Sequence, residues 1–144
     1  MNADPAWPNL VTMFFAQADA LGSKNFLWMK RDGAYRPLDW RQTADQVVRL
    51  ARGLKTLGVG PGDRVALHVA RDRHAVAAVL GIVAAGAAYV PLDPAWPAER
   101  VAMILEDASC RVVIADVPGR EALGASSCPV VNAEALTEVA AETA

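Results

Sequence analysis

Two aspartates are the side chains of this sequence best placed to do chemistry. Asp93 follows the apolar run from Ala87 to Leu92, and Asp116 ends the run RVVIAD. Both runs are predicted parallel strands, whose carboxyl ends form the edge where α/β sheets bind ligands. A phospho-acceptor or Mg²⁺ site of the receiver type uses this edge, but it also needs an acidic pair after its first strand and a lysine after its last. The sequence has neither, and Asp93 before Pro94 is interpreted as a turn residue.

The histidines and cysteines do not form a recognisable site. His68 lies within an apolar strand, where we expect a hydrogen-bonded structural histidine, and His74 begins a helix, where we expect exposure. Neither has a partner at metal-ligand spacing, so no metal site is predicted. Cys110 and Cys128 are too few for a disulfide framework and are expected to be reduced, small hydrophobic residues of a cytoplasmic protein.

The glycine-rich segment Gly58–Val59–Gly60–Pro61–Gly62 resembles a phosphate-binding loop only at first sight. A phosphate cradle follows a strand and opens a helix, so that free N–H groups face the anion. This segment follows a predicted helix and precedes a predicted strand. We therefore interpret it as a helix stop and a turn.

The elements that would position these residues follow from periodicity and turn signals. A helix is predicted over Leu10–Leu21, then a β-hairpin around Arg31–Ala34, and then a helix that is capped by Asp39 and Gln42 and ends at Gly58. From Asp63 onward strands alternate with helices. Strands are predicted at 64–69, 87–92, 111–116 and 129–132, helices at 72–85 and 97–108, a turn-rich segment follows 116, and an acidic helix begins at Ala133. This order predicts an α/β fold: a doubly wound, mostly parallel sheet with helices on both faces, preceded by the hairpin.

Length and composition narrow the class of protein. The chain has 144 residues, 53% of them hydrophobic and 21% charged, and its formal net charge is −2. These values exclude a disordered chain, and the mixed charges predict no nucleic-acid partner. The uncharged run 75–92 contains two glycines and Pro91, so we interpret it as a buried helix, a turn and a strand, with no membrane span. The start MNADPAWPNL is unlike a secretory signal, and we expect a cytoplasmic protein.

Two segments resemble the adenylate-forming (AMP-dependent synthetase/ligase) superfamily. They are GLKTLGVGPGDRVAL (53–67) and GIVAAGAAYVPLDPAWPAERVAMILEDASCRVVI (81–114). AAGAAYVPLDP followed by WPAER is especially similar to amino-acid-activating adenylation domains of peptide synthetases. The stretch from Phe26 through DGAYRPLDWRQTADQVVRLARGLKTLG looks equally like an acyl-CoA synthetase. The resemblance covers about nine tenths of the chain and implies that residues 1–144 form a single partial domain, the N-terminal part of an AMP-binding domain.

The resemblance implies ATP-dependent activation of a small-molecule carboxylate to an acyl adenylate, with Mg²⁺ accompanying the ATP. A thiol, either of CoA or of a carrier-protein phosphopantetheine, would then accept the acyl group. The matched residues belong to the family's scaffold motif and not to its chemistry. They are Gly86, Tyr89, Pro91, Asp93, Pro94 and Arg100.

The family's phosphate loop, adenine pocket, ribose-binding aspartate and catalytic lysine lie beyond the matched segments, and no lysine follows Lys55. We therefore assign no catalytic, cofactor-binding or metal-binding residue, and expect neither ATP nor the thiol cofactor to bind this chain well.

Three hypotheses stay open. The first is the N-terminal portion of a carboxylate-activating ligase that is inactive as an isolated chain. The second is one half of a split ligase that needs a partner chain, and the third is a non-catalytic α/β interaction module. Whether this chain is itself an enzyme stays open. The sequence also leaves open the carboxylate (fatty, aromatic or amino acid), the thiol acceptor, the native end of the product and the oligomeric state.

Overall fold

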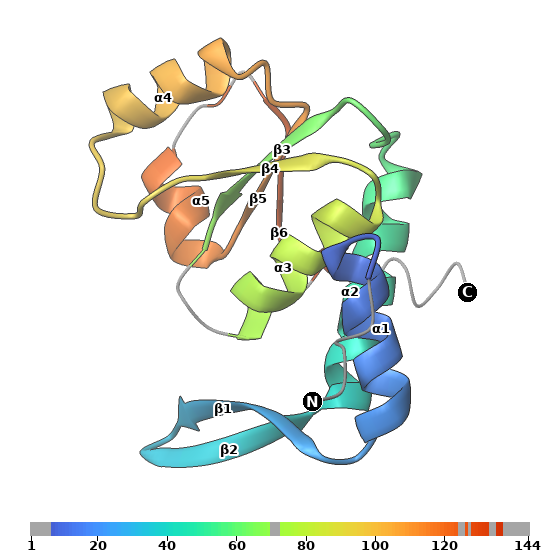
Figure 1. Ribbon diagram of the computed structural model, residues 1–144. Helices are drawn as coiled ribbons and strands as arrows, with labels where there is room; N and C mark the ends of the chain where they lie inside the picture. The colour runs from blue at the N-terminus through green and yellow to red at the C-terminus, as the bar shows by residue number, and fades with distance from the viewer. Residues whose placement is uncertain (1–6, 70–72, 124–125, 127, 133–134, 137–144) are drawn as a thin grey trace. The chain divides into compact units, whose positions relative to one another are not determined.

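The computed structural model describes residues 7–69, 73–123, 126, 128–132 and 135–136 (Figure 1). The helices are α1 Leu10–Leu21, α2 Trp40–Thr56, α3 Arg73–Ala84, α4 Ala98–Asp107 and α5 Val117–Leu123. The strands are β1 Asn25–Arg31, β2 Ala34–Asp39, β3 Arg64–His68, β4 Ala88–Pro91, β5 Val112–Ala115 and β6 Val130–Asn132. The chain divides into two compact units, residues 1–45 and 46–144, and the residues of α2 belong to both.

The first unit is held together by aromatic rings from α1, β1 and the first residue of α2. The rings of Phe26 and Trp40 lie 3.9 Å apart between centroids, and Phe14 of α1 lies 5.9 Å from Trp40. Phe14 is buried, and such ring pairs add to the free energy gained by burying their area. The predicted helix over Leu10–Leu21 is confirmed, and the side chain of Asn9 caps it by accepting a 2.8 Å hydrogen bond from Thr12 N–H.

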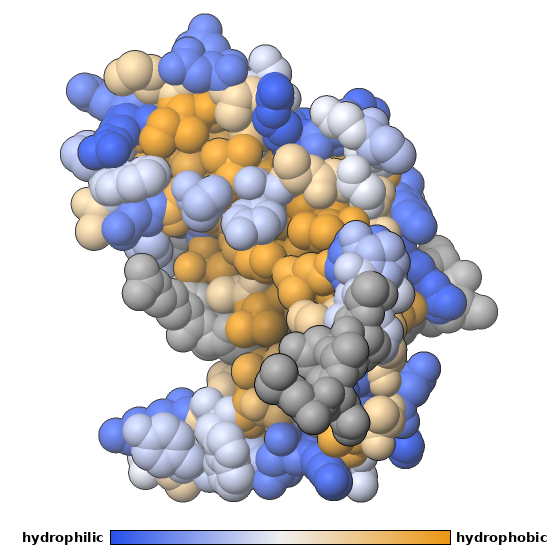
Figure 2. All heavy atoms as spheres, viewed as in Figure 1, coloured by the Kyte–Doolittle hydropathy of each residue, from blue (hydrophilic) through white to orange (hydrophobic). Residues whose placement is uncertain are grey.

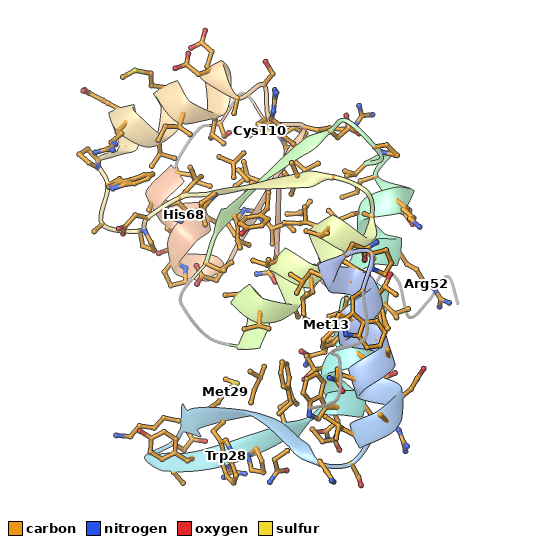
Figure 3. The ribbon with its side chains drawn as sticks, viewed as in Figure 1. Met13, Trp28, Met29, Arg52, His68 and Cys110 are labelled. Carbon is orange, nitrogen blue, oxygen red and sulfur yellow. The ribbon has the colours of Figure 1, made fainter. Side chains whose placement is uncertain are left out.

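The predicted hairpin is also confirmed. β1 and β2 pair antiparallel and are joined by Asp32 and Gly33, with φ angles of 52° and 78°. Two consecutive residues with positive φ form a two-residue turn whose twist matches that of the two flanking strands. This requirement explains the Asp-Gly pair. Figure 3 shows Trp28 and Met29 on opposite sides of the hairpin, as the alternation along a strand requires.

α2 begins with the predicted capping box. The Asp39 carboxylate accepts a 2.7 Å hydrogen bond from Gln42 N–H, and the Gln42 side chain accepts one of 2.9 Å from Asp39 N–H. Thr43, which is fully buried, donates from its hydroxyl to the Asp39 carbonyl over 2.9 Å. The helix start is thus fixed by reciprocal side-chain and backbone contacts, as the spacing of Asp39 and Gln42 predicts.

The second unit contains a four-stranded sheet in the order β4-β3-β5-β6, and all its pairs are parallel. Two clusters of apolar side chains pack on opposite faces of this sheet. One joins side chains of α2 and α3 to Val65, Leu67, Val112 and Ile114. The other joins side chains of α4 and α5 to Ala66 and Val113. The predicted doubly wound parallel sheet, with helices on both faces, is therefore confirmed.

β4 is the strand that this packing covers least. β3 and β5 are buried at nearly every position, whereas Ala88, Tyr89 and Pro91 of β4 are exposed, and Tyr89 is 44% exposed. Figure 2 shows apolar atoms over much of the face on which Figure 1 draws β4. Strands of parallel sheets are ordinarily covered on both faces, so β4 departs from the rule that β3 and β5 follow.

The segment predicted as turn-rich contains α5, so that prediction is wrong. Pro118 lies in the first turn of α5, where a missing N–H breaks no helical hydrogen bond. The acidic helix predicted from Ala133 falls largely on residues outside the described part of the chain.

The uncharged run 75–92 divides into most of α3, a turn and β4. In the residues that the structure describes, no helix has both the length and the apolar character needed to cross a membrane.

The capping box gives a first prediction. Asp39→Ala removes the acceptor of Gln42 N–H and should lower the free energy of unfolding by about 1 kcal/mol, while Asp39→Asn, which keeps an acceptor oxygen, should stay near the parent value. Urea denaturation of the three proteins measures the difference. An Asp39→Ala variant as stable as the parent would show that the box adds nothing.

The contact between α2 and α3 gives a second prediction. A Cβ added to Gly81 would lie 2.5 Å from Cδ2 and 3.1 Å from Cβ of Leu50, which is 1% exposed and packed in the core cluster. Gly81→Ala should therefore cost about 1–3 kcal/mol of unfolding free energy, although alanine is the better helix former by about 1 kcal/mol.

Gly60→Ala is the matched control for Gly81→Ala, because a Cβ at Gly60 meets no atom within 4 Å. It should change the free energy of unfolding by less than about 0.5 kcal/mol. If Gly81→Ala stabilises the protein, the close approach of α3 to Leu50 is not a constraint.

Candidate functional site

The carboxyl edge of the parallel sheet is the place where this fold would bind a ligand. β3 lies between β4 and β5 in the sheet. The connection that follows β3 leads to β4 on one side of β3, and the next connection leads to β5 on the other side. Ligands of open α/β sheets bind where the connections diverge in this way. Here that point lies at the ends of β3 and β5, where His68 pairs with Ala115.

Asp93, which follows β4, folds back on its own turn. Its carboxylate accepts a 2.8 Å hydrogen bond from Ala95 N–H, and its carbonyl accepts one of 3.0 Å from Trp96 N–H. An Asp side chain bonded to the backbone two residues on is a common turn device. The interpretation of Asp93 as a turn residue is confirmed.

Asp116, which follows β5, caps the start of α5. Its carboxylate accepts a 2.7 Å hydrogen bond from Gly119 N–H, and its carbonyl accepts one of 2.9 Å from Arg120 N–H. These contacts satisfy backbone donors that the first turn of a helix leaves without partners. Asp93 and Asp116 thus both support backbone turns at this edge.

The space between the ends of β3 and β5 is filled by the first turn of α5. A Cβ added to Gly119 would overlap the carbonyl oxygen of His68 and would lie 2.6 Å from its Nδ1 and 2.9 Å from the Asp116 carboxylate. Only a residue without a side chain fits there. Figure 3 shows His68 at this end of the sheet, beside α5. The usual ligand position of the fold is therefore taken by the chain itself.

His68 itself is 2% exposed, as expected for a structural histidine. Its buried Nδ1 has no hydrogen-bond partner among the described residues, so the expectation of a hydrogen-bonded histidine is not met at Nδ1 and stays a prediction for Nε2. The close approach of Gly119 places a Cα, which is not a hydrogen-bonding group, against this side of the ring. The side chain of His74 lies outside the described part of the chain. Among the described residues, no group of three or more His, Cys, Asp and Glu side chains could hold a metal ion.

The glycine-rich segment is a helix stop and a turn, as predicted. Gly58 and Gly62 have φ angles of 84° and 87°, which favour glycine. Gly60 N–H donates 2.9 Å to the Asp63 carboxylate, and Asp63 N–H donates 3.1 Å to the Gly60 carbonyl. The Asp63 carboxylate therefore accepts the hydrogen bond of Gly60 N–H, which a bound phosphate would need.

The described residues do not fit a nucleotide triphosphate with Mg²⁺. Gly60 N–H of the glycine-rich turn donates to Asp63, and Gly119 N–H of the first turn of α5 donates to Asp116. At the carboxyl edge, Gly119 lies directly against His68 and leaves no room even for a Cβ. This arrangement can hold strand ends and helix starts in place, and we derive no catalytic step from it. The residue that sequence reasoning missed is Gly119. No local signal pointed to it, because its close approach is to His68 of another element and the helix around it was itself not predicted.

Comparisons with known proteins agree with this fold. The family of AMP-binding enzymes matches residues 14–143 of the chain. AMB antimetabolite synthetase AmbB of Pseudomonas aeruginosa is 40% identical over 101 residues, which are 70% of this chain and 8% of that protein. The chain thus spans less than a tenth of the length of this relative.

Solved structures of peptide synthetases share the fold. The nonribosomal peptide synthetase FmoA3 superposes with a TM-score of 0.83 at 32% identity, over 94% of this chain and 14% of that one. FmoA3 has also been solved in an AMPPNP-bound form, with a TM-score of 0.81.

The N-terminal subdomain of Klebsiella oxytoca NpsA, in complex with 3-hydroxybenzoyl-AMSN, superposes with a TM-score of 0.79 at 21% identity, over 90% of this chain and 31% of that one. The parallel sheet, its hairpin and the match along nearly the whole sequence lead to one conclusion: the chain belongs to the AMP-binding enzymes of the adenylate-forming superfamily, and its fold is that of part of their N-terminal subdomain.

Proposed function

We propose that this chain is the N-terminal portion of an ATP-dependent ligase that activates a carboxylate as an acyl adenylate and passes the acyl group to a thiol. The family match carries this proposal. The similarity to peptide synthetases favours an amino or aryl acid over a fatty acid, and the phosphopantetheine of a carrier protein over CoA. We further propose that residues 1–144 act as one partial domain in the cytoplasm.

The role of this chain in that ligase is to be the scaffold on which the reaction site is built. ATP supplies the leaving group of the reaction when it is bound, and the described residues of this chain do not cradle it. What they supply is a rigid sheet, whose strand ends are fixed by Asp93 and Asp116. Stabilising the charge of a departing pyrophosphate requires aimed donors, and Gly60 N–H of the glycine-rich turn already donates to Asp63. We therefore propose that the isolated chain is inactive.

The exposure of β4 also supports the second hypothesis, a split ligase. A parallel strand whose residues Ala88, Tyr89 and Pro91 are exposed has a surface that further structure would cover, either later in the same chain or in a partner chain. A non-catalytic module needs no such cover. The two ligase hypotheses differ only in where the covering segment is encoded.

A chimera tests the proposed function. Residues 14–143 of this chain would replace the corresponding segment of FmoA3, which is similar over nearly the whole chain. The chimera should catalyse ATP–pyrophosphate exchange with the parent's substrate at a tenth of the parent rate or better, because the exchanged segment is a scaffold. The isolated 144-residue chain should show no exchange above a boiled sample.

The matched control is the same chimera carrying Gly81→Ala, which should unfold at lower urea concentration and lose exchange in parallel. A chimera that has native-like circular dichroism and no exchange would contradict the proposed function. Exchange by the isolated chain with any carboxylate would contradict its proposed inactivity.

A further inference from the structure

Cys110 and Cys128 lie at the same edge of the sheet, on neighbouring strands. Cys110 precedes β5 by two residues, and Cys128 precedes β6 by two. β5 and β6 are parallel, and the ladder bond nearest to the cysteines joins Val113 N–H to the Pro129 carbonyl over 2.9 Å. The register of β5 and β6, continued to this edge, places Cys128 level with Arg111, one residue from Cys110. Neighbouring strands lie about 4.8 Å apart and successive residues about 3.3 Å apart, so Cα atoms with this offset are about 6 Å apart, and disulfides join Cα atoms about 4.4–6.8 Å apart.

The side chains of the two cysteines lie on the same face of the sheet. The Cys128 thiol donates to the Cys110 carbonyl oxygen over 3.0 Å. Both cysteines pack in the apolar cluster that α4 and α5 form on their face of the sheet, with Cys128 buried and Cys110 half-buried. The two cysteines, which are 18 positions apart in the sequence, are thus in direct contact in the fold.

Electrostatics give the two thiols different roles. Burial raises the pKa of Cys110, and the nearby Arg64 guanidinium partly offsets this rise by favouring the thiolate. Burial also raises the pKa of Cys128, and a negative charge on Cys110 raises it further. The thiolate is the reactive form. Cys110, which is the more exposed and has a cation beside it, is therefore the thiol that reacts first.

We propose that Cys110 and Cys128 are a redox pair that a small disulfide, such as oxidised glutathione, converts to an intramolecular disulfide. The Cys110 thiolate attacks one sulfur of the glutathione disulfide, and the first glutathione leaves as a thiolate. The Cys128 thiolate then attacks Cys110 Sγ in the mixed disulfide, and the second glutathione leaves. Two protein thiols are oxidised, one glutathione disulfide is reduced to two thiols, and the two protons pass from the protein to the glutathiones.

The bond would fasten the last strand of the described sheet. β6 has three residues, all half-buried, and pairs only with β5 in the described structure. The loop that the bond closes contains β5 and α5. A cross-link across it restricts the unfolded chain and so stabilises the folded one. In a reducing compartment the two cysteines remain thiols, and under oxidising conditions they form the disulfide.

The test compares the folded and unfolded chain in glutathione redox buffers. The full chain is equilibrated at several ratios of oxidised to reduced glutathione, with and without concentrated urea, quenched with acid and weighed by mass spectrometry. The internal disulfide appears as the loss of two hydrogens with no glutathione added. The effective concentration of the two thiols should be at least ten times higher in the folded chain than in urea. The oxidised chain should also melt at a higher temperature than the reduced one.

Cys110→Ser and Cys128→Ser are the matched controls, because a serine hydroxyl keeps a donor of similar size. Each should form a glutathione adduct at most and no internal disulfide. An effective concentration in the folded chain equal to or below that in urea would overturn the proposal, and so would glutathione adducts that persist in the folded wild-type chain without internal closure. This wild-type comparison decides the question even if a serine variant fails to fold.

Discussion

The burial of β3 and β5 on both faces is the constraint on which the rest of the second unit depends. Their side chains alternate between a cluster under α2 and α3 and a cluster under α4 and α5, so neither strand can be exposed without opening a core. Parallel strands need crossover connections, and these connections are the helices that cover them. The close approach of Gly81 to Leu50 and of Gly119 to His68 follows from this double cover, because helices must lie near the sheet and near one another.

The sequence was informative wherever local chemistry decides structure. Asp39 with Gln42, Asp32 with Gly33, and Gly58 carry their conformations in their residue types, and all three predictions hold. The α5 helix was missed because Pro118 and Gly119 resemble a turn, whereas Asp116 and the approach of Gly119 to His68 stabilise a helix start. That approach brings α5 against β3, elements that are far apart in the sequence, and no local pattern encodes it. The unpartnered Nδ1 of His68 is a product of the same tertiary contact.

We propose no catalytic residue among those that the structure describes, because the candidate site is built from groups that support the backbone. The edge where an α/β sheet would bind its ligand is closed by Gly119, and the aspartates at that edge cap backbone turns. A family match thus carries ancestry and fold along nearly the whole chain, while the chemistry of a site depends on specific side chains. β4 is exposed at three of its four residues, unlike β3 and β5, which are buried at nearly every position.

The most direct test of the central claim is a nuclear magnetic resonance titration of the ¹⁵N-labelled chain with millimolar Mg·ATP. The claim is that this chain supplies the scaffold of a carboxylate-activating domain and not its nucleotide site. It predicts that the backbone amides of His68, Asp93, Gly119 and the turn at Gly60 keep their chemical shifts throughout the titration. Saturable shifts at the carboxyl edge or at the glycine-rich turn would contradict it, because they would show that these backbone donors are free to bind phosphate.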